Sequence, residues 1–239
     1  AAWNTDSGSG GELPQGIIAR NMLSHPPHSQ GGPTNRSTSP NGAGMNFDLW
    51  RHQARAWVFH FIGRDAWAYD EYVAAFDRAP SARAASHLGF IACSHRRFEE
   101  GVRWFEAAQR LEPGNADTLF NLGYALEQGG RPAEACTAFA QAVQAKPTLD
   151  RAWYGLATAQ ARQGHHAEAA QALEETVRLQ PMHGEAWYHL GMACHLSAQA
   201  ERLQEVIVSL KRFDPKRANQ LILDCGRAEF AHLRSELPF

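Results

Sequence analysis

The chain has 239 residues, of which 44% are hydrophobic and 20% are charged, and its formal net charge is -2. These values are typical of one or two globular domains. Lysine and arginine are spread along the chain rather than gathered in a run, so neither nucleic acid nor an anionic membrane surface is expected as a partner. No apolar run approaches the roughly 20 residues of a membrane-spanning helix, and no membrane insertion is expected.

The four cysteines stand far apart, at Cys93, Cys136, Cys194 and Cys225. Their spacing fits neither a zinc site nor a CxxC redox motif. Each is therefore expected to be a small buried hydrophobe, as is usual in a reducing compartment. This predicts a cytoplasmic location. The chain begins without a methionine, which is compatible with a removed leader.

Residues 1–45 differ in composition from the rest of the chain. Up to Gly44 they hold eight of the 20 glycines and five of the 12 prolines. Such a composition buries too little apolar surface to offset the loss of chain entropy on folding, so a disordered or linker segment is expected. One apolar island, GIIARNML at residues 16–23, is interpreted either as a short binding motif or lid, or as part of a tag or linker.

From residue 46 onward, similar residues recur every 34 positions. The recurring sets are Leu88, Leu122, Leu156 and Leu190; Pro113, Pro147, Pro181 and Pro215; and Phe105, Phe139, Leu173 and Ile207. A fixed period of this length indicates a repeat architecture, in which each unit buries its apolar face against the next.

Each unit is expected to be an antiparallel pair of helices. In residues 116–149, Leu119, Leu122 and Leu126 are three, four and seven positions apart, which places them on one helical face. Gly129-Gly130 then ends this helix, and Pro132 begins a second one at a position where its missing N–H costs nothing. Small residues on both helices allow a close approach.

The repeat resembles the tetratricopeptide repeat family, whose pattern is W-x2-L-G-x2-Y, then A-x3-F, then P, within a unit of about 34 residues. Here it is carried by Trp187, Leu190, Gly191 and Cys194 in one unit, and by Ala135, Phe139 and Pro147 in another. The resemblance implies an all-α fold, a right-handed superhelical solenoid closed by a C-terminal capping helix. It also implies that Trp153 and Trp187 are core residues.

The repeat domain is expected to span residues 46–239. It is divided into a degenerate repeat at 49–81, four regular repeats at 82–115, 116–149, 150–183 and 184–217, and a capping helix at 218–239. The capping helix is expected to continue to about Glu236, with Leu221, Cys225 and Leu233 facing inward.

In the family that the sequence resembles, the first helices of successive units line a concave groove. The helical stripe that would face this groove carries candidate partner-binding residues: Phe90, Phe120, Asn121, Tyr124, Arg151, Tyr154 and Tyr188. Phe120, Tyr154 and Tyr188 recur at the same place in three consecutive units and would form an aromatic column, which suits a partner peptide or helix. The alternative is that these rings only pack neighbouring helices together.

Chaperone-binding members of the family hold a terminal carboxylate with two asparagines and three basic residues. Asn121 and Arg151 occupy two of those five places, but Ser86, Phe90 and Gly155 occupy the others and cannot supply the charge. Recognition of a chaperone C-terminus is therefore not expected. Asn121 and Arg151 would instead contact the partner backbone or an acidic side chain.

The sequence contains no nucleophile motif, phosphate loop or dinucleotide fingerprint, and its histidines lack metal-ligand spacing. We therefore expect no cofactor, no metal and no catalysis. The predicted function is a protein-interaction scaffold or adaptor whose partner segment lies in the concave groove. The alternative is a regulatory or targeting region of an enzyme complex, with catalysis on another chain or on a part missing from this one.

Overall fold

The computed structural model describes residues 47–234. The segment expected to be disordered, residues 1–45 with its apolar island, lies outside the described residues. In the described part every regular element is a helix. These helices form two compact units, one ending at Pro113 and the other beginning at Gly114.

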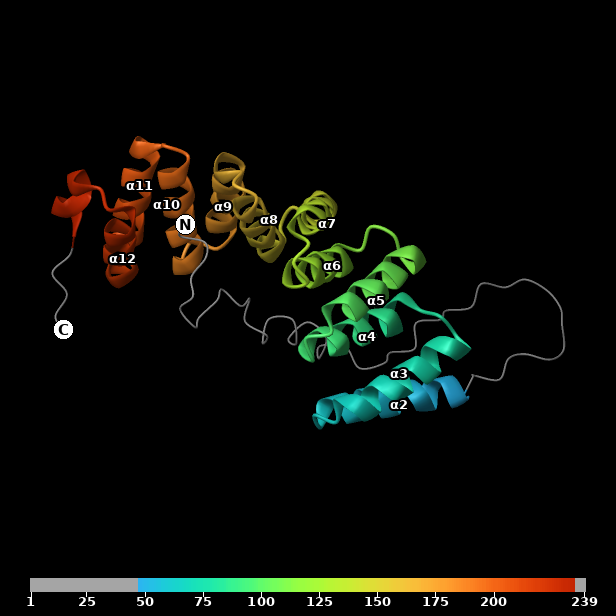
Figure 1. Cartoon of the computed structure of the whole chain (residues 1–239). Coiled ribbons are helices and arrows are strands. Elements are labelled where there is room, and N and C mark those ends of the chain that lie inside the picture. The colour runs from blue at the N-terminus through green and yellow to red at the C-terminus, as the bar shows by residue number, and fades with distance from the viewer. Residues whose placement is uncertain (1–46, 235–239) are drawn as a thin grey trace. The chain divides into compact units, whose positions relative to one another are not determined.

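The first unit holds two helix pairs. The pairs are α2 (Phe47–Phe61) with α3 (Asp65–Arg78), and α4 (Ala82–Ser94) with α5 (Phe98–Leu111). Within each pair the helices pack along each other, and α3 also packs on α4, as Figure 1 shows. Short turns join the helices, so consecutive helices run antiparallel.

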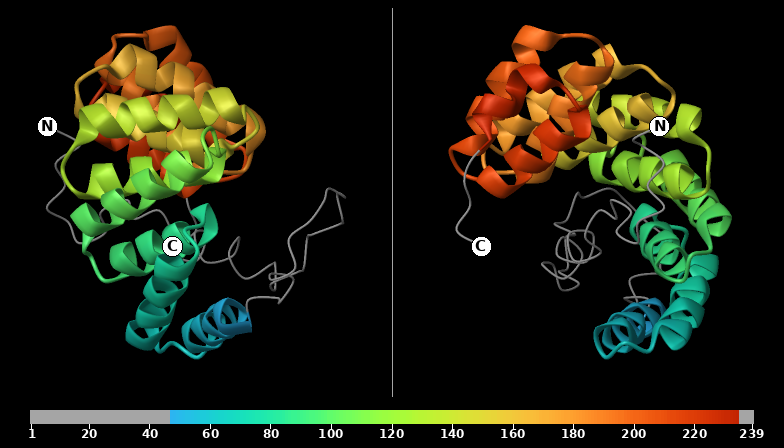
Figure 2. Two further views of the ribbon diagram at one scale, coloured as in Figure 1. Left: turned by 90° about the vertical axis from the view of Figure 1, so that its right-hand side faces the viewer. Right: turned by 60° about the vertical axis from the view of Figure 1, so that its left-hand side comes forward.

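The second unit continues the same arrangement with three further pairs. They are α6 (Ala116–Gln128) with α7 (Pro132–Ala145), α8 (Asp150–Arg162) with α9 (His166–Leu179), and α10 (Gly184–Leu196) with α11 (Ala200–Lys211). Helix α8 packs on α7 and α10 packs on α9, so the pairs stack in sequence order (Figure 2). The predicted all-α series of antiparallel helix pairs is confirmed.

One position in the turn within each regular repeat has a left-handed backbone. Gly130 (φ 78°) and Gly164 (φ 82°) occupy it in the second and third regular repeats. In the first and fourth, Arg96 (φ 59°) and Ala198 (φ 61°) adopt the same conformation. Since a side chain makes this conformation about 1–2 kcal/mol less favourable, the repeat imposes its turn even where glycine is missing.

The end of the chain differs from the expected capping helix at 218–239. The last α-helix, α12 (Pro215–Cys225), begins earlier, with Asp214 as N-cap accepting a 3.0 Å hydrogen bond from the Arg217 N–H. It stops at Gly226, whose left-handed backbone (φ 63°) ends the helix. A separate 3-10 helix, η1 (Ala228–Leu233), comes next. The expectation of one helix to about Glu236 was therefore wrong, because the left-handed backbone at Gly226 stops the helix.

The core of the second unit is organised around Phe139. Its ring is fully buried, and it lies against Gly123 of α6 and Gly155 of α8. A Cβ atom added at Gly123 would lie 2.8 Å from the ring, and one added at Gly155 would lie 2.6 Å from it. Phe139 therefore fills the space that these glycines leave, and it joins one repeat to the next.

We expect Gly155→Ala to destabilise the second unit by about 1–3 kcal/mol, because the new methyl group overlaps the Phe139 ring. The cost exceeds the gain of up to about 1 kcal/mol that alanine brings to a helix interior. Urea unfolding followed by circular dichroism measures the difference. The double variant Gly155→Ala with Phe139→Leu, in which the ring is removed, should lose less than the sum of the two single changes. Additive losses would show that the two residues do not compete for this space.

None of the described helices is both long enough and apolar enough to cross a membrane.

Candidate partner-binding site

Six of the seven candidate residues lie in the second unit, on the first helix of successive pairs. Phe120, Asn121 and Tyr124 are on α6, Arg151 and Tyr154 are on α8, and Tyr188 is on α10. The seventh, Phe90, belongs to α4 of the first unit. It is half-buried, and its ring meets the His60 ring edge to face at 5.6 Å.

Phe120 is a packing residue in this structure. Only 1% of its surface is exposed. Its ring lies 5.8 Å from the Phe139 ring on one side and 4.7 Å from the Arg151 guanidinium on the other. Tyr124 is likewise buried. The rings on α6 are therefore buried under the surface of the site and do not form that surface.

Arg151 joins α8 to α6. Its guanidinium is paired with Asp117 through Nη2 and lies over the Phe120 ring. The Nε atom, however, is buried and has no hydrogen-bond partner among the described residues. A buried donor without an acceptor is uncommon, because losing water without gaining a partner costs free energy.

Tyr154 is enclosed by two histidines that come after it in the chain. Its ring stacks on that of His183 at 5.5 Å and lies 5.8 Å from that of His189. Only 6% of its surface is exposed. Burial raises the pKa of the Tyr154 hydroxyl, and the charges of Glu185 and Glu127 raise it further. Tyr154 is therefore neutral at physiological pH, and its ring is packed in the interior against the two histidines.

Tyr188 is the most accessible ring of the predicted column, because it remains half-buried. Its hydroxyl donates a 2.6 Å hydrogen bond to Oδ2 of Asp224 on α12. Its ring lies 5.5 Å from the His189 ring, nearly perpendicular to it. Burial raises the pKa of the Tyr188 hydroxyl, and the hydrogen bond to Asp224 raises it further. The ring is thus fixed in place with part of its face open.

Charged groups of both signs border these rings. The His189 ring lies 3.8 Å from a Glu185 carboxylate oxygen and lowers the pKa of that carboxyl. Glu127 of α6 is buried, and burial raises the pKa of its carboxyl, although the nearby Arg162 and a hydrogen bond from Thr158 oppose the shift. Such mixed polarity suits hydrogen bonds to a peptide better than binding of a purely apolar helix.

His183, His189 and Asp224 were not among the residues predicted for this site. His183 caps the start of α10 by accepting a 3.1 Å hydrogen bond from the Ala186 N–H. His189 occupies the position that Gly155 holds in the preceding repeat. This replacement of glycine by histidine on the predicted groove stripe was the available signal. No such sequence signal pointed to Asp224, because its contact with α10 arises only from the packing of α12.

Trp153 and Trp187 are not the core residues that the resemblance implied. Both are half-buried. Their indole N–H groups donate to the backbone carbonyls of Pro147 at 2.9 Å and of Pro181 at 2.8 Å. Each tryptophan therefore hydrogen-bonds the loop that precedes its own helix. On α8 the buried residue is instead Tyr154, the next residue after Trp153.

The described residues offer no arrangement suited to metal-dependent chemistry. No group of three or more histidine, cysteine or acidic side chains within the described part could hold a metal ion. All four cysteines are free thiols. Burial raises the pKa of Cys194 and of Cys225 to about 11, so both remain protonated and unreactive near neutral pH.

Comparison with known proteins agrees with the repeat seen in the sequence. A tetratricopeptide repeat family model matches residues 88–150 and 152–204. A search of the curated proteins gave no match.

Several solved structures share the fold. One is YrrB, described as a TPR protein with an unusual peptide-binding site, with 21% identity, a TM-score of 0.66, and coverage of 76% of this chain and 93% of that one. Another is MamA, with 17% identity, a TM-score of 0.65, and coverage of 81% and 100%. A MamA fragment from Desulfovibrio magneticus RS-1 has 17% identity, a TM-score of 0.63, and coverage of 72% and 99%.

The family match, the period of the sequence repeat and the stacked antiparallel helix pairs agree with one another. The chain is a tetratricopeptide repeat protein.

Proposed function

We propose that the second unit is a protein-interaction scaffold that binds an extended segment of a partner across α6, α8 and α10. Tetratricopeptide repeat proteins are protein-interaction scaffolds, and the repeat fold is typically non-catalytic. YrrB, which shares the fold, is described as having a peptide-binding site. The single observation that most favours this role is the half-buried Tyr188 ring, which a 2.6 Å hydrogen bond to Asp224 holds in place with part of its face open, because a fixed and accessible aromatic ring suits contact with a partner side chain.

The binding surface that we propose differs in detail from the aromatic column expected from the sequence. Phe120, Tyr124 and Tyr154 are buried, so they would hold the surface in shape. Asn121 is half-buried, and no described residue hydrogen-bonds its side-chain amide. Asn121 and Arg151 would bind the partner backbone or an acidic side chain, and the open face of Tyr188 would pack against a partner side chain. The function requires no cofactor, and the cytoplasmic location stays a prediction.

The experiment is a selection from a random-peptide display library with the whole chain as bait, followed by fluorescence polarisation on the selected peptides. Arg151→Met keeps the length of the side chain but removes all its hydrogen-bond donors. We expect it to weaken binding at least about tenfold, because arginines in buried positions often dominate interface energy.

The matched control is Arg178→Met on α9, whose side chain is 63% exposed and pairs only with Glu175 in its own helix turn. This variant should bind as the native chain does. Selected peptides that bind the Arg151→Met variant at native strength would place the binding surface elsewhere. A selection that yields no peptide would argue against an extended segment as the partner.

A further inference from the structure

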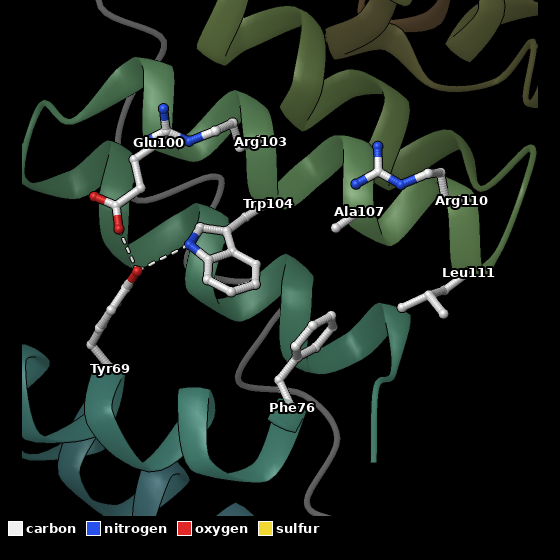
Figure 3. A pocket seen from close by; sticks show the side chains of 8 residues that line it. All are labelled: Tyr69, Phe76, Glu100, Arg103, Trp104, Ala107, Arg110 and Leu111. Carbon is white, nitrogen blue, oxygen red and sulfur yellow. Dashed lines mark hydrogen bonds between the residues drawn. The ribbon is translucent and has the colours of Figure 1, made fainter. Parts of the chain in front are cut away.

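The first unit has a groove between α3 and α5, separate from the site described above. It has a volume of about 560 Å³. Phe76 from α3 and Trp104 and Leu111 from α5 form its apolar floor, as Figure 3 shows. The Phe76 and Trp104 rings meet edge to face at 5.3 Å. We call this hollow the α3–α5 groove.

Trp104, which lines the groove, departs from the repeat. The equivalent residues of the next two repeats are Ala138 and Ala172, both of which are buried. The indole of Trp104 is much larger than these side chains and remains half-buried between α3 and α5. The space beside it is left open.

One end of the groove is closed by paired polar groups. The Trp104 Nε1–H donates a 3.0 Å hydrogen bond to the Tyr69 hydroxyl oxygen. The Tyr69 hydroxyl in turn donates to the Glu100 carboxylate, which also pairs with Arg97 at 2.9 Å. The negative charge of Glu100 is therefore balanced within the protein and does not repel an acidic ligand.

The remaining charged groups of the groove are two cations, Arg103 and Arg110. Both are exposed, and no described residue forms an ion pair or hydrogen bond with either guanidinium. They are seven residues apart on α5, which corresponds to about 10 Å along a helix. The equivalent positions of the next repeat hold the neutral residues Thr137 and Gln144. Of these two repeats, only the one that lines the groove therefore has a pair of arginines at these positions.

We propose that the α3–α5 groove binds an acidic amphipathic helix of a partner protein. Trp104, Ala107 and Leu111 lie three and seven positions apart and so present one apolar stripe along α5. A partner helix lying along this stripe would insert apolar side chains between Phe76 and Leu111, where Leu111 is 46% exposed. Two of its carboxylates, two turns apart, would pair with Arg103 and Arg110. This inference does not depend on the site of the second unit.

The test uses the whole chain and a labelled helical peptide, with leucine and phenylalanine at positions i, i+4 and i+7 and glutamates two turns apart beside them. Fluorescence polarisation should show saturable binding that weakens as salt is raised. The double variant Arg103→Glu with Arg110→Glu should bind at least about tenfold more weakly. Leu111→Ala should bind about fivefold more weakly, because it removes exposed apolar area from the floor.

The matched control is Lys146→Glu with Arg212→Glu, which changes the net charge equally at exposed positions of the second unit. It should bind within about twofold of the native chain, since neither residue lines the groove. Circular dichroism verifies that each variant is folded.

Three results would overturn the proposal. The first is an unchanged affinity in the arginine double variant. The second is equal binding of a peptide with lysine in place of glutamate, or with alanine in place of its leucine and phenylalanine. The third is absence of binding to the native chain. Loss of binding in Arg151→Met would instead assign the peptide to the second unit.

Discussion

Phe139→Ala is expected to lower the free energy of unfolding of the second unit by about 3–5 kcal/mol, the range observed for buried phenylalanines in protein cores. The ring is fully buried and contacts the backbone of two repeats at Gly123 and Gly155. The glycines cannot fill the space that the ring leaves, since they have no side chain. The variant therefore loses the apolar burial of the ring and also retains a cavity between repeats.

Urea unfolding monitored by circular dichroism measures this loss. Thr137→Ala, on the exposed face of the same helix, is the matched control and should change stability by less than about 0.5 kcal/mol. Because stability in repeat arrays is spread over neighbouring interfaces, the variant should also broaden the transition as repeats separate. A loss below about 1 kcal/mol would mean that α6 and α8 close over the cavity and that Phe139 does not join the repeats.

The stability of the first unit is expected to fall by about 3 kcal/mol as the pH is lowered from about 6.5 to about 4. His87 is buried, and its ring stacks on that of Tyr72 at 4.7 Å. Burial, aided by the positive charges of Arg83 and His60, lowers the pKa of His87 to about 4. The unfolded chain, with an ordinary histidine pKa near about 6.5, binds the proton at higher pH than the folded chain does.

Between these two pKa values the unfolded state holds more protons than the folded state, so stability rises with pH across this window. Below about pH 4 both states are protonated, and above about 6.5 both are neutral, so the dependence on His87 disappears at either end. The expected loss of about 3 kcal/mol follows because each pH unit within this window changes the free energy of unfolding by about 1.4 kcal/mol.

Comparison with His87→Phe isolates this contribution, because every other titrating group is common to both chains. Phenylalanine retains the stacking on Tyr72 and cannot bind a proton. Tryptophan fluorescence suits the measurement when both chains also carry Trp153→Phe and Trp187→Phe, since the tryptophans that remain, Trp50, Trp57, Trp67 and Trp104 among them, all belong to the first unit. The native chain should lose stability toward pH 4 relative to the variant. Parallel pH profiles would show that His87 is accessible to protons in the folded state.

The candidate site illustrates the limit of a periodic sequence pattern. The period placed Trp153 and Tyr154 on adjacent stripes of one helix, and the conspicuous tryptophan was predicted to be in the core. The structure buries Tyr154 between His183 and His189 and leaves Trp153 half-buried on the Pro147 carbonyl. A rotation of one residue, about 100°, separates the two stripes. Which stripe is covered depends on the side chains of the next repeat.

The α3–α5 groove likewise depends on side chains that come from two helices. Trp104 was visible in the sequence as a large residue in a position of small ones, but an isolated tryptophan is compatible with either a filled or an open interface. The hollow and its charged wall are defined only by the residues around Trp104. These are Phe76 and Tyr69 from α3 and the two arginines from α5. Such contacts between distant segments are not encoded in a local pattern.

The sequence by itself determined the helix pairs of the repeats, their antiparallel arrangement, the period of the repeat and the family, but not the end of the last helix. Glycine and proline positions, helical periodicity and the spacing of small residues are local or strictly periodic features, and each constrains the backbone directly. Tertiary structure alone decided which aromatic rings are buried, which donor of Arg151 has no acceptor among the described residues, and which residues line the groove beside Trp104. These outcomes depend on the size and charge of side chains from neighbouring repeats, because packing is decided by the groups that meet across an interface rather than by the order of residues along the chain.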